Sequence, residues 1–444
     1  MKNGNEYSSE IQEQIFRFVE LLKISAKTKD LKKGASLHTE ILKKRLLEKS
    51  PYIASALITM YTQCGMFAVA QQLLDELPVW DVISWNALIS GYSQHGQGHE
   101  ALSCFERMQR EGLSPDTVTY TCTLKACGSV GAVEKGREIH DEIVCRGLVE
   151  KKLKLGNALV NMYAKCDGDD NSLYELHTMF NRLCDQDVIA WTTLISAYVD
   201  HGNEGKALEC FDQMKEAGVS PNVYTYACAL KACGIIASAE KGKKLHAQVL
   251  RENHNMQLGN ALVDMYVRCG EVWKAGEVFN ELDVRDVVTW NALIGGYAEH
   301  GPGVEALHCF EKMKLEGIYP DAVTFASALK ACGTIGALES GQEIHIEIPP
   351  RYLEKYFFLG NAVVDMYLKC GSFVKAKEVF DKLQQRDLAP WHALIAGYAE
   401  RGDSKQVMEC VKCMQLEGVF LDSGAYVSML KACASTESMQ KNQE

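Results

Sequence analysis

The chain has 444 residues, of which 47% are apolar and 24% charged, and its formal net charge is −11 at pH 7. This is the composition of a globular protein with ample material for a core. No apolar run approaches the roughly 18 residues of a membrane-spanning helix, so no membrane partner is expected. The acidic balance disfavours indiscriminate nucleic-acid binding, which needs a basic surface, but leaves a locally basic groove open.

Residues 1–14 are expected to form a tail ahead of the first repeating element. The opening is rich in acidic residues and has no arginine before Arg17. It lacks both the apolar stretch of a secretory signal and the arginine-rich, acid-poor character of an organelle transit peptide. We therefore expect either that the protein stays where it is made or that the natural chain begins further upstream.

From residue 15 onward, three phrases recur in a fixed order. One reads DVISWNALISGY at its first occurrence, and its copies begin at Asp81, Asp187, Asp286 and Asp387. The next reads TVTYTCTLKACG, and its copies begin at Thr117, Val223 and Ala322. The last reads GNALVNMYAKC, and its copies begin at Gly156, Gly259 and Gly360. Each cycle therefore contains three related repeats of roughly 31–36 residues, a length typical of helical arrays.

Each repeat predicts two helices. In the repeat that begins at Val82, apolar residues from Trp85 to Tyr92 are spaced three and four apart, as on one face of a helix. Gly96 ends that helix, and a second apolar helical pattern runs to Gly112. A lone helix pair cannot bury both apolar stripes, whereas stacked pairs share one core. The predicted fold is all-α: a right-handed α-solenoid superhelix of stacked antiparallel helix pairs.

The cysteines follow the same register. Seventeen are present, and Cys127, Cys233 and Cys332 all stand in the phrase LKAC. A disulfide framework belongs to small secreted domains and would not repeat in this way. We interpret these residues as small buried apolar side chains in a reducing compartment.

These phrases resemble the pentatricopeptide repeat family, and more narrowly its plant P-L-S subclass, in which three repeat variants alternate. The resemblance covers residues 15–444. It implies the boundaries L 15–50, S 51–81, P 82–116, L 117–152, S 153–187, P 188–222, L 223–255, S 256–286, P 287–321, L 322–356, S 357–387, P 388–422 and a partial L 423–444.

The resemblance implies recognition of single-stranded RNA, with one base read by each repeat. In the family, the fifth and the last residue of a repeat contact the base edge. By position, the implied uracil readers are Asn86 with Asp116, Asn157 with Asp187, Asn260 with Asp286, Asn291 with Asp321, and Asn361 with Asp387. Thr192 with Asn222 resembles an adenine reader and Ser55 with Asp81 a guanine reader, whereas His392 with Asp422 is assigned no base. The L repeats carry Thr121, Ala227 and Ala326 at the fifth position, which the simple code reads poorly.

The family also stacks bases between the second residues of adjacent repeats. The implied stacking residues are Tyr52, Ile83, Val118, Ile189, Tyr224, Val288, Val323 and Phe358. Apolar and aromatic side chains suit the face of a base. Lys154 and Gln257 depart from this pattern, and Ala389 is small. Read from residue 51 with the N-terminus at the 5′ end, the implied target is G-U-N-U-A-N-U-U-N-U-N, where N is unassigned.

Simpler interpretations compete with these assignments. Asn and Asp at helix starts are commonly caps, although their recurrence at fixed offsets favours base reading. The sequence HxE, as at His140, is half of a zinc deaminase signature, but the PCxxC half is missing and only Cys410 and Cys413 form a CxxC. We interpret both as chance products of helices and expect no metal, no cofactor and no catalytic residue.

The expected function is that of an RNA-binding adaptor in an organelle. In the P-L-S subclass the usual outcome is C-to-U editing by a deaminase-like extension that follows the repeats. This chain ends within an L repeat at Glu444, so editing would need a separate deaminase and accessory proteins. The family's location suggests the mitochondrion, with the chloroplast as the alternative. A protein-binding scaffold, for which the −11 charge would suit a basic partner, and a degenerate copy without a dedicated target remain open.

Overall fold

The structure is a computed structural model. It describes residues 3–47, 50–77, 80–148, 153–166, 170–183, 186–251, 255–383 and 388–420, together with residues 426, 427 and 430. Within these ranges the regular structure is helical throughout. None of the helices described is long and apolar enough to cross a membrane.

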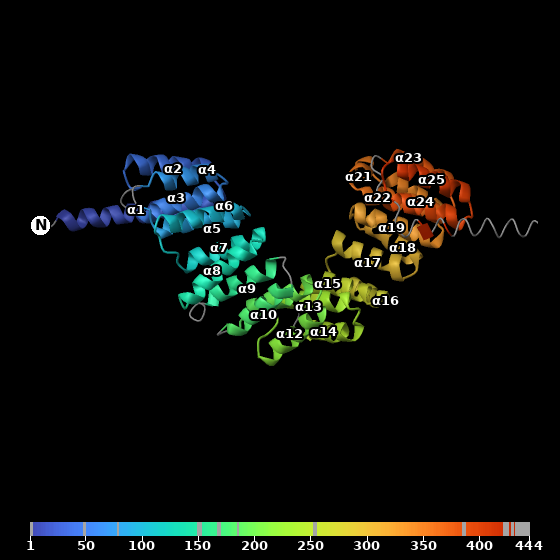
Figure 1. Cartoon of the computed structure of the whole chain (residues 1–444), viewed down its shortest axis with the longest axis horizontal. Coiled ribbons are helices and arrows are strands. Elements are labelled where there is room, and N and C mark those ends of the chain that lie inside the picture. Colours follow the sequence, from blue (N-terminus) through green and yellow to red (C-terminus); the bar gives the residue numbers. More distant parts are fainter. Residues whose placement is uncertain are drawn as a thin grey trace, which may run out of the picture. The chain divides into compact units, whose positions relative to one another are not determined.

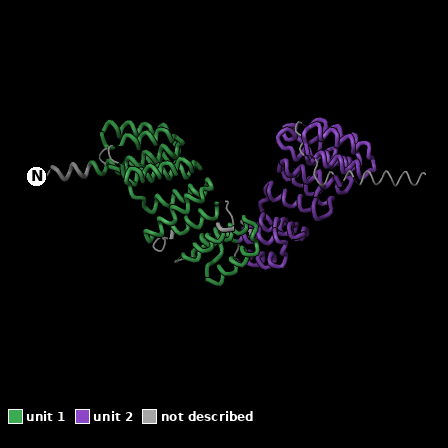
Figure 2. Tube along the Cα trace, viewed as in Figure 1, with its two compact units in different colours: residues 1–225 green, residues 226–444 purple. Residues whose placement is uncertain are grey.

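The helices divide between two compact units, Met1–Thr225 and Tyr226–Glu444, and the division falls inside α13 (Figure 2). The first unit contains α1 (Asn3–Thr28), α2 (Leu31–Lys43), α3 (Pro51–Gln63), α4 (Phe67–Asp75), α5 (Val82–Gln94), α6 (Gly98–Arg110), α7 (Thr117–Val130), α8 (Val133–Cys145), α9 (Leu153–Lys165), α10 (Asp170–Arg182), α11 (Val188–Asp200), α12 (Glu204–Glu216) and the start of α13 (Val223–Ile235). The second contains the rest of α13 and α14 (Ala239–Arg251), α15 (Asn255–Arg268), α16 (Val272–Glu281), α17 (Val287–His300), α18 (Gly303–Leu315), α19 (Ala322–Ile335), α20 (Leu338–Glu347), α21 (Pro350–Lys355), α22 (Phe357–Lys369), α23 (Phe373–Lys382), α24 (Leu388–Glu400) and α25 (Ser404–Leu416).

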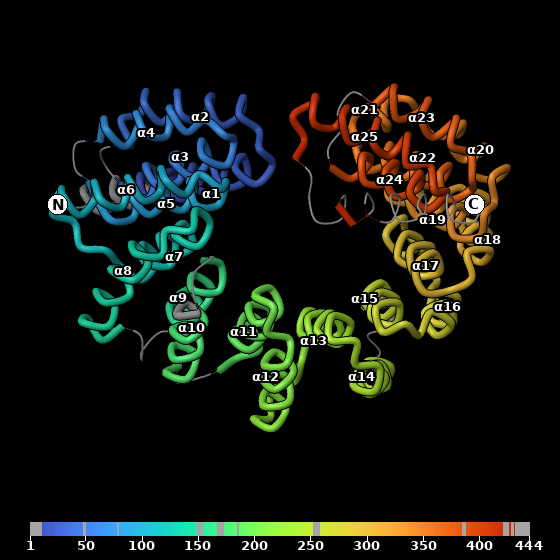
Figure 3. The backbone as a smooth tube through the Cα atoms, turned by 45° about the vertical axis from the view of Figure 1, so that its right-hand side comes forward, coloured from blue at the N-terminus to red at the C-terminus, as the bar shows by residue number. Residues whose placement is uncertain are grey.

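Within each compact unit the helices form two layers. The first helices of successive repeats pack side by side, α3 on α5, α5 on α7 and α7 on α9 in one unit, and α15, α17, α19, α22 and α24 in the other (Figure 1). Second helices such as α6, α8, α16 and α18 pack on the first helix of their own repeat and on that of the next. Figure 3 shows the backbone alternating between the two layers. The first helices therefore form a continuous row, and side chains at equivalent positions in them recur along that row.

Three kinds of contact join successive repeats, and they recur in a fixed order. Phe279 and Phe380 of second helices stand edge-on to the buried Trp290 and Trp391 of the next first helix, with ring centroids 4.5 and 4.6 Å apart. At the next junction a phenylalanine takes the place of the tryptophan, as where Phe310 packs against Phe325. This order explains the period of three repeats, because the second helix of each repeat type carries the side chain that packs against the first helix of the repeat type that follows it.

The third kind of contact is a glycine packed against a methionine. Gly341 of α20 faces Met366 of α22 so closely that a Cβ atom at residue 341 would lie within 3.0 Å of the Met366 sulfur. The same pairing occurs at Gly34 with Met60, Gly136 with Met162, and Gly242 with Met265. Each of these glycines stands four residues before the histidine of a second helix. The recurrence of glycine was visible in the sequence, but its contact with methionine was not.

Gly341→Ala is expected to lower the free energy of unfolding by about 1–3 kcal/mol, because the added methyl group overpacks a filled junction. Gly205→Ala is a matched control, since a Cβ atom there meets nothing within 4 Å and alanine favours the helix. Thermal melts of the two variants test this. Equal melting temperatures for both would contradict the close packing.

Two elements differ from the sequence-based expectation. Helix α1 begins at Asn3, inside the segment expected to be a tail; no glycine or proline follows Gly4 until Gly34, so nothing in the sequence stops the helix earlier. The repeat 322–356, expected to hold two helices, also holds the short helix α21, which begins at Pro350 after Pro349. Most of the partial repeat 423–444 lies outside the described residues.

Candidate functional site

A series of apolar side chains is exposed along the row of first helices. They are the predicted stacking residues Tyr52, Ile83, Val118, Ile189, Tyr224, Val288, Val323 and Phe358, with exposed fractions between 42% at Ile83 and 76% at Tyr224. Each is the second residue of its helix. Exposed large apolar side chains are common on protein surfaces, and what distinguishes these is that they recur at one position of the helix in both units. Lys154 and Ala389, at the same position elsewhere, are also exposed.

The fifth residue lies almost one turn further along the same helices. Asn86 is 8% exposed, and its Nδ2 atom donates to Oδ1 of Asp116 at 3.0 Å. Nδ2 of Asn291 donates to both carboxylate oxygens of Asp321, at 3.0 and 3.1 Å. The structure thus brings together pairs of residues that are about thirty positions apart in the sequence.

The aspartates serve two purposes at once. Oδ1 of Asp116 accepts the backbone N–H groups of Val118 and Thr119, both at 2.8 Å, and so caps α7. Because α7 packs beside α5, a side chain that caps α7 also lies against Asn86. Asp116 therefore caps α7, as the simpler interpretation of the sequence expected, and also bonds Asn86.

The same pairing occurs at two further sites with longer distances. Nδ2 of Asn157 is 3.2 Å from both carboxylate oxygens of Asp187, and Nδ2 of Asn260 is 3.4 Å from both oxygens of Asp286. Hydrogen bonds, first of all that from the Thr289 hydroxyl, lower the pKa of the Asp286 carboxyl group. Asp286 therefore remains ionised at neutral pH and can act only as an acceptor.

A threonine that the sequence analysis did not single out joins most of these pairs. The Thr119 hydroxyl lies 2.6 Å from Oδ1 of Asn86, and it also lies 3.0 Å from Oδ1 of Asp116. Thr289 and Thr324 stand in the same relation to Asn260 and Asn291, each at 2.5 Å. The available signal was the threonine that stands three residues after Asp116, Asp286 and Asp321.

The two predicted purine readers are built differently. The Thr192 hydroxyl donates to the Val188 carbonyl at 2.6 Å and lies 2.7 Å from the Thr225 hydroxyl. Thr225 in turn bonds Asn222, whose Oδ1 caps α13. The Ser55 hydroxyl donates to the Tyr52 carbonyl at 3.1 Å, and Asp81 caps α5 through Ser84. Thr192 is thus linked to Asn222 through Thr225, whereas Ser55 bonds its own helix and Asp81 bonds the start of α5.

For two predicted pairs, only one of the two residues lies within the described part of the chain. Asp387 and Asp422, the expected partners of Asn361 and His392, lie outside the described residues. Asn361 is on α22 and His392 on α24, each at the fifth position of its helix. Thr121 of α7 bonds its own helix through the Thr117 carbonyl.

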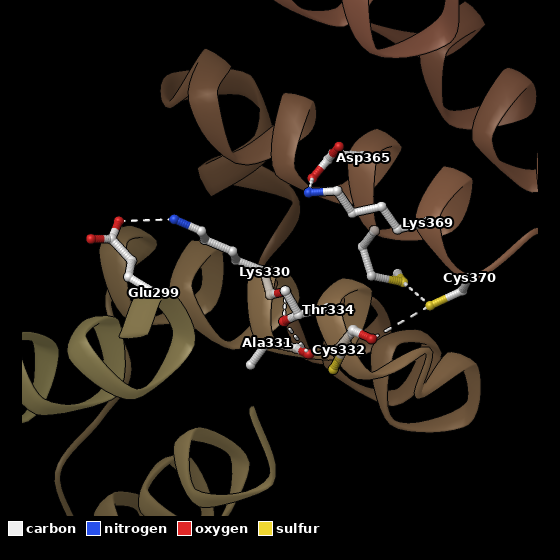
Figure 4. A network of polar contacts seen from close by, with 9 residues as sticks. Glu299, Lys330, Ala331, Cys332, Thr334, Asp365, Lys369 and Cys370 are labelled. Atoms are coloured by element: carbon white, nitrogen blue, oxygen red, sulfur yellow. Dashed lines mark hydrogen bonds and ion pairs between the residues drawn. The ribbon is translucent and has the colours of Figure 1, made fainter. Parts of the chain in front are cut away.

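Charged side chains on the first helices of the second compact unit are matched in ion pairs. Figure 4 shows Lys330 of α19 reaching Glu299 of α17, at 2.8 Å, and Lys369 turning to Asp365 of its own helix, also at 2.8 Å. Arg268 and Asp264 of α15 form an equivalent pair at 2.8 Å. The cations on these helices are therefore balanced locally.

In the first compact unit the equivalent cations face neutral residues. Lys125 stands at the position of Lys330, and the position of Glu299 is taken there by Gln94. Lys165 likewise stands at the position of Lys369, with Asn161 in place of the aspartate. Both lysines are exposed. The acidic partners seen in the second unit are therefore absent from the equivalent positions beside these two lysines.

The histidines of the HxE sequences, His38, His140 and His345, bond tyrosines, as does His246 at the equivalent position of another repeat. Nδ1 of His38, His140, His246 and His345 lies 2.8–3.0 Å from the hydroxyl of Tyr61, Tyr163, Tyr266 and Tyr367 respectively, in the first helix of the next repeat. Among the described residues, no cluster of three or more His, Cys, Asp or Glu side chains could hold a metal ion. Burial raises the pKa of the Cys410 thiol to about 11, and the fifteen described cysteines are free thiols.

Acidification below pH 6.5 is expected to destabilise the fold through these histidines. Burial lowers the pKa of all four below the usual 6.5, so the unfolded chain takes up protons first as the pH falls. Their contribution is complete above pH 6.5 and is lost as the pH falls towards and through the folded pKa. Thermal melts between pH 7.5 and 5 should show the decline, and His140→Asn should reduce it. The exposed His99→Asn is the control; a decline unchanged in His140→Asn would contradict this account.

Comparison with known proteins follows the same repeats. Residues 80–129, 186–234 and 285–334 match the PPR repeat family, and residues 118–148, 260–287, 361–388 and 389–419 match the PPR repeat. A chloroplastic pentatricopeptide repeat-containing protein of Arabidopsis thaliana is 31% identical to this chain, over 98% of the chain and 69% of its own length. The chain belongs to the pentatricopeptide repeat family.

Other pentatricopeptide repeat proteins show how far the likeness extends. A second chloroplastic relative from Arabidopsis thaliana is 30% identical over 96% of this chain and 52% of its own length. A mitochondrial one is 30% identical over 98% of this chain and 62% of its own length. The chain thus spans roughly half to two-thirds of these relatives. The crystal structure of the pentatricopeptide repeat protein PPR10 from maize matches with a TM-score of 0.55 at 17% identity, over 96% of this chain and 72% of that one, and shares the helical solenoid fold.

Proposed function

We propose that this pentatricopeptide repeat chain binds single-stranded RNA in a sequence-specific way and directs RNA processing in an organelle. The observation that supports this best is the coincidence of two regular series on the first helices. Exposed apolar side chains stand at the second position, and hydrogen-bonding side chains stand one turn away at the fifth. Nucleic-acid bases need both, because each has an apolar face and a polar edge.

The chemistry of the polar series fits base edges. After their bonds to aspartate and threonine, the amides of Asn86, Asn260 and Asn291 each keep one N–H group and one carbonyl lone pair. These match the donor and acceptor groups on the edge of a pyrimidine. The proposed target is G-U-N-U-A-N-U-U-N-U-N, read from residue 51, with the pairs named above as readers.

The test compares two RNAs. One carries this target, and the other has every assigned base exchanged, at a stated near-physiological salt concentration. A preference above tenfold for the target, which corresponds to about 1.4 kcal/mol, is the expected result. A folded chain that binds neither RNA would overturn the proposal and favour a protein-binding scaffold or a copy without a dedicated target.

The cellular role extends the same proposal. The relatives are named chloroplastic or mitochondrial, so we place this chain in one of these organelles, with the mitochondrion first. We assign it to the P-L-S subclass, supported by the three junction types that recur in order. C-to-U editing is the proposed outcome, with a separate deaminase and accessory proteins recruited to the bound RNA, and no catalytic step is assigned to this chain.

A further inference from the structure

The amide group of a reading asparagine is fixed at both ends in three of the described repeats. Its Nδ2 atom donates to the aspartate, and its Oδ1 atom lies within hydrogen-bond distance of a threonine hydroxyl, whose single proton is shared between this oxygen and an aspartate oxygen. The three threonines are Thr119, Thr289 and Thr324, and each is at most 1% exposed. Such a threonine is too deeply buried to touch a bound base. Its hydroxyl instead favours the amide orientation that points Oδ1 of the asparagine towards the threonine.

Asn157 has no threonine hydroxyl beside its Oδ1 atom. The residue three positions after Asp187 is Ala190, which is 1% exposed and carries no hydroxyl. Oδ1 of Asn157 is consequently buried without a hydrogen-bond partner, while Nδ2 shares its bond between the two oxygens of Asp187 at 3.2 Å. An orphaned buried acceptor contributes nothing to holding the amide, so the bonds to Asp187 alone fix its orientation.

The direction of the amide decides between the two pyrimidines. Uracil presents an N3–H donor beside the O4 acceptor, whereas cytosine presents the N3 acceptor beside the N4 amino donor. An amide whose oxygen and nitrogen match uracil therefore meets cytosine with acceptor facing acceptor and donor facing donor, and must reverse to match it. At Asn86 or Asn291 reversal would break the bonds to both aspartate and threonine. At Asn157 it would break the bonds to Asp187 alone.

We propose that Thr119, Thr289 and Thr324 are positioning residues that fix the reading amide and thereby favour uracil over cytosine, and that Asn157, facing Ala190, accepts both pyrimidines. This inference rests on the proposed RNA binding. It assigns a specificity role to the third residue of the following repeat, through the neighbouring asparagine. The fourth base of the target is then a pyrimidine of either kind, while the second, seventh and eighth are uracil.

The experiment measures dissociation constants for target RNAs with U or C at the fourth base, read by Asn157, or at the eighth, read by Asn291. The natural chain should favour U less at the fourth base than at the eighth. Ala190→Thr should raise the preference for U at the fourth base about fivefold, the value of one neutral hydrogen bond. Ala190→Val adds bulk without a hydroxyl and should leave it unchanged.

Thr324 supplies the reciprocal test at the eighth base. Thr324→Val should lower the preference for U there by a similar factor, and Thr324→Ser should restore it. Thr324 also closes the cap of α19, so melting temperatures are measured without RNA to confirm that each variant is folded. Ala190→Thr introduces the residue that the equivalent positions of α7, α17 and α19 already carry, so it serves the test even if Thr324→Val is poorly folded.

The outcomes distinguish failure of the proposed threonine effect from failure of the proposed RNA reading. If the natural chain prefers the target RNA but Ala190→Thr raises only the melting temperature and leaves the U to C ratio unchanged, the threonine is merely structural and the inference is overturned. If the natural chain shows no preference for the target RNA over its exchanged counterpart, RNA reading itself fails. Equal U to C ratios at the fourth and eighth bases in the natural chain also contradict the inference.

Discussion

Replacing Thr192 by Asn together with Asn222 by Asp is expected to change the preferred fifth base of the target from adenine to uracil. The ratio of dissociation constants for the two RNAs should shift by more than tenfold. The surroundings already suit a uracil reader, because the Thr225 hydroxyl lies 2.7 Å from that of Thr192 and 3.0 Å from Oδ1 of Asn222. Thr324 stands in the corresponding place between Asn291 and Asp321.

The double variant should also remain folded. Asn222 caps α13 by accepting the Thr225 N–H at 2.9 Å, and aspartate is an equally good cap. The seventh base, read by Asn260, provides the internal control, since its preference should not change. A variant that melts normally but keeps its preference for adenine would show that residues 192 and 222 do not read this base.

Trp290→Ala is expected to cause the largest loss of stability, about 3–5 kcal/mol. Trp290 is completely buried and meets Phe279 with ring centroids 4.5 Å apart, so its removal leaves a cavity at a junction between repeats. Because each repeat contacts only its neighbours, the damage should stay local.

Hydrogen exchange of the backbone amides distinguishes this local loss from global unfolding. Protection should fall in α16 and α17, while α3 and α5 should be unaffected. Trp273 is the matched control, since it is 62% exposed and its replacement by Ala should change exchange little. Uniform loss of protection along the chain would argue against junctions that act independently.

The repeating pattern of apolar residues was sufficient to predict the helices and their pairing. Spacing three and four apart located helices such as α5, and the recurring Asp at the end of a repeat located the start of the next one. These are local properties of the sequence. The short helix α21 was missed because Pro349 and Pro350 were not recognised as a helix start. Helix α1 already begins at Asn3, ahead of the predicted first repeat at residue 15, and its first turns carry little apolar signal.

The sequence predicted which asparagine and aspartate belong together in the candidate site, but not the threonine beside them. Fixed offsets indicated which residues belong together, such as Asn86 and Asp116. They did not show that Thr119 completes the group, because a threonine near a helix start is a common cap and its second bond crosses to another repeat. The bonds from histidine to tyrosine, such as that from His140 to Tyr163, were missed for the same reason: both partners look ordinary until two helices place them together.

The ion pairs on the first helices have a consequence for how the chain would respond to salt. A phosphate that binds Lys330 must first displace Glu299, so one ion pair replaces another and few condensed cations leave the RNA. Only cations without an acidic neighbour, such as Lys125 and Lys165, would release them, each adding about 0.7 to the slope of log affinity against log salt for a single strand. Affinity would then depend more on the bases than on the sugar–phosphate chain, and the protein would leave unmatched transcripts quickly.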